Sequence, residues 1–124
     1  MVNVLSTVLK TPKDRTQYKK WIKALRSGSF SQGKSRLQGS QGYCCLGVAC
    51  KLLIEEENLK KESGGTLVGN MPRSAQPNAP KWLQDIGDVR FTAANGKQLP
   101  ILNDVDNYTF AQIADVLEKE YKEM

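Results

Sequence analysis

The sequence predicts an α+β fold: a single small domain over residues 1–124, with about three main helices packed against a minor antiparallel sheet or hairpin. Three observations lead to this prediction. Two stretches carry apolar residues at helical spacing, one run of twelve residues is apolar almost throughout, and an Asn-Gly pair separates two short apolar segments. The length of 124 residues and the hydrophobic content of 40% suit one domain with one core.

The first main helix is expected over about residues 14–27. Its apolar residues follow the i, i+3, i+4, i+7 pattern of one helical face, and Ser27-Gly28 provides a stop. Asp14 or Thr16 is the expected N-cap. The four residues of the apolar face are Tyr18, Trp21, Ile22 and Leu25. The next segment, residues 29–42, is rich in glycine and serine and is interpreted as a loop.

The run from Tyr43 to Ile54 is apolar except for Lys51, which predicts a buried central helix or, as the alternative, a buried strand. It contains all three cysteines of the chain, Cys44, Cys45 and Cys50. Their number is odd and no histidine is present, so we expect reduced thiols packed as small hydrophobic residues, without a zinc site. A nucleophilic role for Cys44, near the start of the helix and after a basic loop, is the alternative.

The second half of the chain has shorter signals. Thr66–Val68 fits a short strand, and Pro80–Ile86 fits one or two helical turns. Val89–Phe91 and Leu99–Leu102 flank Asn95-Gly96, which predicts a hairpin. Thr109 and Gln112 form a capping box for a last helix that runs to about Tyr121. The acidic turn that begins at Asp104 lacks the glycine and the glutamate of a calcium-binding loop, so we interpret it as an Asx-rich turn.

Several function classes are disfavoured by composition. The absence of histidine excludes Ser-His-Asp and Cys-His catalysis, and no acid–base pair stands out, so a binding role is favoured over an enzymatic one. No run approaches the length of a membrane span, and the first residues lack the order of a signal peptide, so a cytoplasmic protein is expected. We predict no metal and no other cofactor, and the oligomeric state stays open.

Charge is distributed unevenly along the chain. Residues 10–36 contain nine basic residues and one acidic residue, whereas residues 103–124 contain six acidic and two basic residues. The basic segment is a candidate surface for an anion. Alternatively, its lysines are exposed on a helix, or the basic and acidic ends pack together. The candidate ligand-binding residues are Arg26, Lys34, Arg36, Tyr43, Asn103 and Asp104.

Three blocks of sequence carry a resemblance. They are Trp21–Lys34 (WIKALRSGSFSQGK), Gly42–Cys50 (GYCCLGVAC), and Leu102-Asn103-Asp104 followed by Thr109–Asp115 (TFAQIAD). In this order they resemble blocks of a group of short, mostly uncharacterised phage and prophage proteins. Pro80–Leu83 resembles a fourth, weaker block. The resemblance covers roughly half the chain and implies a phage setting, with action in the host cytoplasm during infection.

Three hypotheses follow from the residues and the resemblance together. The first is a binding protein that sequesters a small phosphate-bearing, nucleotide-type host defence signal. In it, Arg26, Lys34 and Arg36 bind phosphates with the backbone of residues 39–42, Tyr43 stacks on a base, and Asn103 and Asp104 bind the edge of that base. The second is an inhibitor that docks its basic 10–36 face on an acidic host protein. The third is a nucleic-acid-binding accessory protein.

Overall fold

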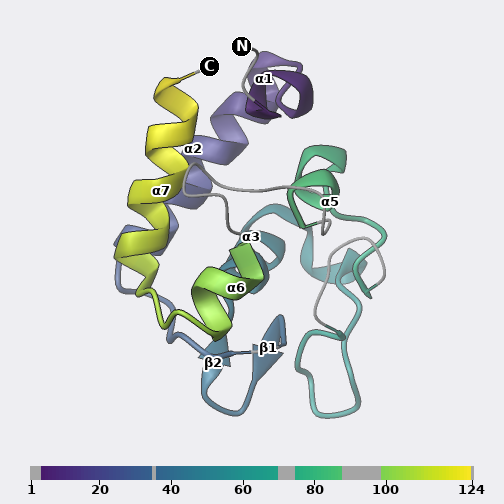
Figure 1. The fold of residues 1–124 in the computed structure, drawn as a ribbon. Helices are drawn as coiled ribbons and strands as arrows, with labels where there is room; N and C mark the ends of the chain where they lie inside the picture. Colours follow the sequence, from purple (N-terminus) through teal and green to yellow (C-terminus); the bar gives the residue numbers. More distant parts are fainter. Residues whose placement is uncertain (1–3, 35, 70–74, 88–98, 124) are drawn as a thin grey trace.

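The computed structural model describes residues 4–34, 36–69, 75–87 and 99–123. Its architecture is α+β, as predicted, and helices make up most of it (Figure 1). In chain order the elements are α1 (Val4–Val8), α2 (Pro12–Arg26), β1 (Gln38–Gly39), β2 (Gly42–Tyr43), α3 (Cys45–Leu53), the 3-10 helix η1 (Glu56–Asn58), α5 (Lys81–Gly87), α6 (Leu99–Asp104) and α7 (Phe110–Lys122).

Helix α2 begins two residues earlier than predicted, because its N-cap is Thr11 and not Asp14 or Thr16. Thr11 Oγ1 accepts from the backbone N–H of Asp14, and the Asp14 carboxylate accepts from the N–H of Thr11, so the two residues form a capping box. Pro12 follows the cap, where a residue without an N–H costs nothing. The predicted apolar face is confirmed, since all four of its residues are buried.

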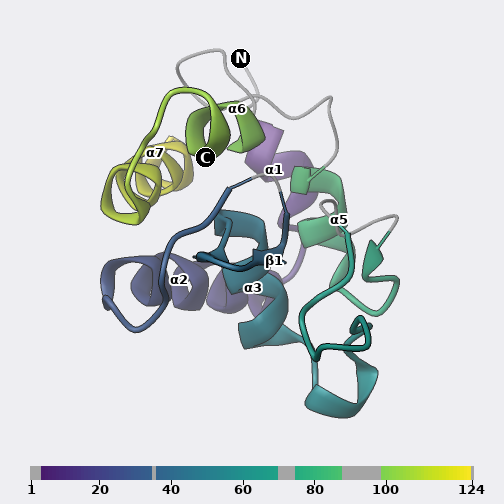
Figure 2. The same cartoon turned by 90° about the horizontal axis from the view of Figure 1, so that it is seen from below.

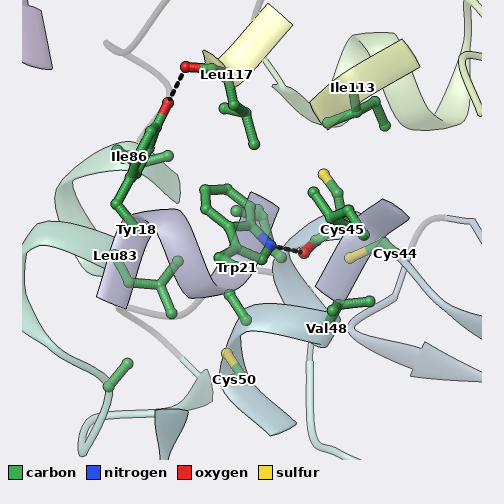
Figure 3. Packing of buried hydrophobic residues seen from close by; sticks show 14 of the residues in the cluster. Tyr18, Trp21, Cys44, Cys45, Val48, Cys50, Leu83, Ile86, Ile113 and Leu117 are labelled. Atoms are coloured by element: carbon green, nitrogen blue, oxygen red, sulfur yellow. Dashed lines mark hydrogen bonds between the residues drawn. The ribbon is translucent and has the colours of Figure 1, made fainter. Parts of the chain in front are cut away.

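Helix α3 is the buried central helix that the apolar run predicted. Figures 1 and 2 show it in the middle of the molecule, with α2 and α7 on one side and α5 on the other. Every residue from Cys45 to Cys50 is buried. The indole Nε1 of Trp21 donates to the carbonyl of Cys45 over 2.9 Å, which satisfies a polar group inside the core (Figure 3).

Helices α2 and α7 lie side by side and antiparallel along one edge of the molecule (Figure 1). Near the middle of α2, Tyr18 donates from its hydroxyl to the carbonyl of Leu117 over 2.8 Å, and its ring stacks on Tyr121 (Figure 3 shows the hydrogen bond). At the end of α2, Arg26 pairs with Asp115 and Glu118 of α7. The alternative that the basic and acidic ends pack together is therefore confirmed for these two helices.

The predicted minor antiparallel sheet is present as a two-stranded hairpin. Its strands β1 and β2 place Gln38 opposite Tyr43 and Gly39 opposite Gly42, so the hairpin combines the end of the segment interpreted as a loop with the first residue of the apolar run. Thr66–Val68 contributes one antiparallel bridge, between Leu67 and Lys61.

Only one side of the hairpin predicted around Asn95-Gly96 lies within the described residues. Val89–Phe91 and the Asn-Gly turn lie outside the described residues, but the strand predicted over Leu99–Leu102 is wrong, because these residues belong to helix α6. Pro100 favours this outcome, since proline suits the first turn of a helix and cannot donate to a strand ladder. The helix predicted over residues 80–86 is confirmed as α5, and the capping box of Thr109 and Gln112 is confirmed at the start of α7.

Candidate functional site

The basic loop between α2 and α3 is held in place by backbone pairing. The N–H of Gly33 donates to the carbonyl of Tyr43 over 2.7 Å, and the N–H of Tyr43 donates to the carbonyl of Ser31 over 2.8 Å. The two paired segments lie close together at Gly42, whose φ is +138° and where a Cβ atom would lie 2.2 Å from the carbonyl oxygen of Ser31. Only glycine fits this position. These hydrogen bonds and this close contact therefore fix the backbone of the loop that carries the basic side chains.

Gln32 ties the same loop to the connection between α6 and α7. Its Nε2 donates to Oδ1 of Asn103 (3.0 Å) and to the carbonyl of Tyr108 (2.7 Å), and its Oε1 accepts from the backbone N–H of Phe110 (3.1 Å). The sequence reasoning missed Gln32, because a glutamine in a glycine-rich loop gives no signal of its own. The sequence does contain an indirect signal, the polar pair Asn103-Asp104, because these side chains need hydrogen-bond partners from outside their own helix.

Asn103 is fully buried, although it was predicted to bind the edge of a base. Its Nδ2 donates to the carbonyl of Gly33 over 2.9 Å and to Oδ1 of Asp104 over 2.8 Å, while its Oδ1 accepts from Gln32. Both amide N–H groups are thus used inside the protein. Asn103 therefore joins the loop at Gly33 to helix α6, and Asp104 accepts its second amide hydrogen bond.

Two small pockets share Lys34. The first, of about 190 Å³, is lined by Gly33, Lys34, Arg36 and the turn residues Gly39, Ser40 and Gln41. The second, of about 200 Å³, is lined by Gln32, Lys34, Asn103, Asn107 and Tyr108. The Lys34 ammonium donates to the side-chain oxygen of Asn107, and Arg36 pairs with Glu62. We call these two hollows together the Lys34 site.

The other two predicted residues lie apart from this site. The ring of Tyr43 is half-buried and packs edge-on against Phe30, with the ring centroids 5.5 Å apart. Arg26 lines a third hollow, of about 450 Å³, between α2 and α7. There its guanidinium donates to Asp115 over 2.6 Å and to Glu118 over 2.7 Å, which raises the pKa of Arg26 above its usual value. The structure therefore groups Lys34 with Arg36 and with Asn103, and it does not group Arg26 with them.

The cysteines have the properties of core residues. All three thiols are buried, and burial raises the pKa of Cys44 to about 11, that of Cys50 to about 12 and that of Cys45 well above its usual value. Asp104 lies near Cys44 and adds to the increase. A thiolate is therefore scarce at neutral pH, whereas a nucleophile needs a lowered pKa. In the described ranges, no three histidine, cysteine or acidic side chains come together in a way that could hold a metal ion.

A family model matches more than half of the chain. The chain belongs to a family described as a domain of unknown function, DUF8296, whose model matches residues 14–85. The matched range contains the β1–β2 hairpin and α3 and most of α2 and of α5. It includes Lys34 and Arg36 but not Asn103. Searches of curated proteins and of solved structures give no match. Within the described residues, no helix combines the length and the apolar character needed to cross a bilayer.

Proposed function

We propose that this protein acts by binding, as a phage accessory protein that sequesters a small phosphate-bearing, nucleotide-type host defence signal at the Lys34 site. The observation that carries the proposal is that Lys34 is shared by two pockets, one of which also presents Arg36 and the Gly39–Gln41 turn. Two cationic side chains beside a tight backbone turn are a common arrangement for a phosphate group. The phage setting comes from the sequence resemblance alone.

The first pocket supplies the phosphate contacts. Lys34 and Arg36 are both exposed, and the hydroxyl of Ser40 lies on the same lining. Arg36 is paired with Glu62, but both side chains are more than two-fifths exposed. An exposed pair of this kind is worth only about 0–1 kcal/mol. A phosphate with its larger charge can therefore replace Glu62 as the partner of Arg36.

The second pocket suits the polar edge of the ligand. Asn107 and Tyr108 line it together with Lys34 and Gln32, and the amide of Asn107 and the phenol of Tyr108 can form hydrogen bonds with a base or a ribose. Tyr43 lines neither pocket, so the stacking role assigned to it passes in this proposal to Tyr108. Arg26 has no part in the site. The contacts of the ligand are thus Lys34, Arg36, Ser40 and Tyr108.

Calorimetry with a panel of cyclic oligonucleotides and ADP-ribose-type nucleotides tests the proposal. One member should bind, and Lys34→Gln should weaken its binding by about ten- to a hundredfold, because a charge-assisted hydrogen bond contributes about 1.5–3 kcal/mol. Lys20→Gln is the matched control, since Lys20 is exposed on α2 and lines neither pocket. The proposal fails if no member binds at about 100 μM, a concentration that corresponds to a free energy of about −5.5 kcal/mol.

A further inference from the structure

The hollow between α2 and α7 has the chemistry of a docking groove. Its volume is about 450 Å³, and its lining includes Tyr121, the almost fully buried Ile22 and the aliphatic stems of long cationic side chains. We call it the α2–α7 groove. Four cationic side chains and one carboxylate surround this apolar floor; they are Lys19, Lys23, Arg26, Lys122 and Glu118. None of these residues lines the Lys34 site, so the two sites are independent of each other.

The floor of the groove is fixed by the packing below it. Tyr121 stacks on the buried ring of Tyr18 with an interplanar angle of 19° and a centroid distance of 5.8 Å. The Lys19 ammonium lies 5.1 Å from the centroid of the Tyr121 ring. Tyr121 is only partly buried, and it is held in one orientation by these contacts. An incoming apolar side chain would meet a rigid aromatic surface, which keeps the entropic cost of binding low.

The charged side chains around the groove differ in their ion pairs within the protein and in their exposure to solvent. Arg26 forms ion pairs with Asp115 and Glu118, so the negative charge of Glu118 is balanced within the protein. Lys122 lies 3.9 Å from Glu118, and its side chain is 73% exposed. Lys23 is exposed and, among the described residues, has no ion pair. The Lys19 ammonium lies over the ring of Tyr121. Lys23 and Lys122 are therefore the cations available to an outside partner.

We propose that the α2–α7 groove binds an acidic, amphipathic segment of another protein, with an apolar side chain against Tyr121 and the aliphatic stems of the lining lysines, and carboxylates on Lys23 and Lys122. Charge complementarity carries the choice of partner, since a floor of apolar atoms with a cationic rim matches an apolar residue flanked by acids. Nucleic acid fits less well, because Tyr18 and Trp21 are fully buried and offer no stacking surface beside the lysines.

The probe is a labelled amphipathic peptide of about 16 residues, built from glutamate and leucine and followed by fluorescence anisotropy. A poly-glutamate peptide of equal length carries the charge without the apolar anchor. We expect the glutamate–leucine peptide to bind at least about tenfold more tightly than poly-glutamate, because only it fills the apolar floor. Equal affinity for the two peptides, or no binding of either at about 1 mM, would overturn the proposal.

Charge reversal locates the binding surface. The double variant Lys23→Glu, Lys122→Glu should weaken the peptide by about tenfold or more, because each substitution replaces an attraction with a repulsion. The matched control Lys13→Glu, Lys20→Glu changes two exposed lysines of α2 outside the groove and should alter the affinity less than about threefold. If both double variants lost the same affinity for the peptide, the binding would depend on the overall charge of the protein and the proposal would be wrong.

Two further outcomes assign the groove to a different occupant and thereby overturn the proposal. One is a duplex DNA that competes with the peptide and loses its own affinity in the Lys23→Glu, Lys122→Glu variant. The other is concentration-dependent self-association in sedimentation that disappears in that variant, which would place a second copy of this chain in the groove. Calorimetry of the same variant with the phosphate-bearing panel should be unchanged, so a failure here is distinguishable from a failure of the Lys34 site.

Discussion

Gln32 and Asn103 are 71 positions apart in the sequence, and their side-chain amides are joined by a hydrogen bond of 3.0 Å. The same Gln32 accepts from the N–H of Phe110, one of the first backbone donors of α7. The start of α7 is therefore capped twice, by Thr109 from its own chain segment and by Gln32 from the basic loop. Through this pair, the loop that carries Lys34 is fixed to the C-terminal part of the fold.

Removing the amide of Asn103 should destabilise the protein. Asn103→Ala leaves the carbonyl of Gly33 and an N–H of Gln32 without partners in a buried setting. We expect a loss of about 1–3 kcal/mol in urea unfolding. The amide N–H of Phe110 should also exchange faster, because Gln32 loses one of its anchors. Gln41→Ala, at an exposed turn position, is the control and should stay within about 0.5 kcal/mol; an equal loss there would contradict the assignment.

Gly47 lies in the first turn of α3, and the structure explains why a glycine is found within this helix. A Cβ atom at Gly47 would lie 1.8 Å from the carbonyl oxygen of Leu37. Gly47→Ala should therefore cost about 3 kcal/mol or more in unfolding free energy, because backbone cannot move aside as a flexible side chain can. Gly39→Ala is the matched control, since a Cβ atom there would meet nothing within 4 Å. If both variants melt alike, the close approach of Leu37 to α3 is refuted.

The helices could be predicted from the sequence because their signals are local. The spacing of Tyr18, Trp21 and Leu25 in α2, and the capping box of Thr109 and Gln112, depend on residues within two helical turns. The Asn-Gly signal was also local, but Pro100 close behind it favours a helix, and α6 begins at Leu99.

The site could be predicted only in part, because it depends on contacts between distant segments. Lys34 and Arg36 are close in sequence and share a pocket, as a short loop allows. Arg26 is separated from them because α7 packs antiparallel to α2 and brings Asp115 and Glu118 to its guanidinium. Nothing in the residues around Arg26 indicates which carboxylates lie opposite.

The buried thiols predict that stability decreases in alkaline solution. The pKa of Cys44 is raised to about 11 and that of Cys50 to about 12 by burial, so each thiol stays protonated in the folded state after it ionises in the unfolded chain. The stabilisation is fully present below the unfolded pKa of about 8.5 and is lost as the pH rises toward the folded value. In that window we expect a slope of about 1.4 kcal/mol per pH unit for each thiol.

Urea unfolding at several pH values between about 8 and 10.5 measures this slope. Cys50→Ala should reduce the slope by the contribution of one thiol, about 1.4 kcal/mol per pH unit. The cavity that it creates leaves the slope unchanged, because a cavity lowers the free energy of unfolding equally at each pH. Cys45, whose pKa is also raised by burial, gives a second variant of the same kind. A slope that is unchanged in both variants would show that the thiols ionise as easily in the folded protein as in the unfolded chain.

Arg26 provides the last prediction, which separates a structural role from a role in the Lys34 site. The Arg26 guanidinium holds the pKa of the Glu118 carboxyl below its ordinary value of 4.5 through a hydrogen bond of 2.7 Å. A lowered folded pKa contributes stability above the unfolded value, and this stability is lost as the pH falls through the folded value. Arg26→Gln should therefore destabilise the protein at neutral pH, and its deficit should shrink below about pH 4.

The same variant should leave the Lys34 site intact, because Arg26 lines the α2–α7 groove and neither hollow of the Lys34 site. We expect Arg26→Gln to bind a phosphate-bearing panel member within about twofold of the original affinity, whereas Lys34→Gln should lose about tenfold or more. Urea unfolding at two pH values and calorimetry of the same preparations give both readouts. Arg15→Gln, an exposed arginine of α2 outside the described pockets, is the control for a lost positive charge. If Arg26→Gln lost binding as strongly as Lys34→Gln, while Arg15→Gln did not, Arg26 would belong to the phosphate site and the separation of the two surfaces would be wrong.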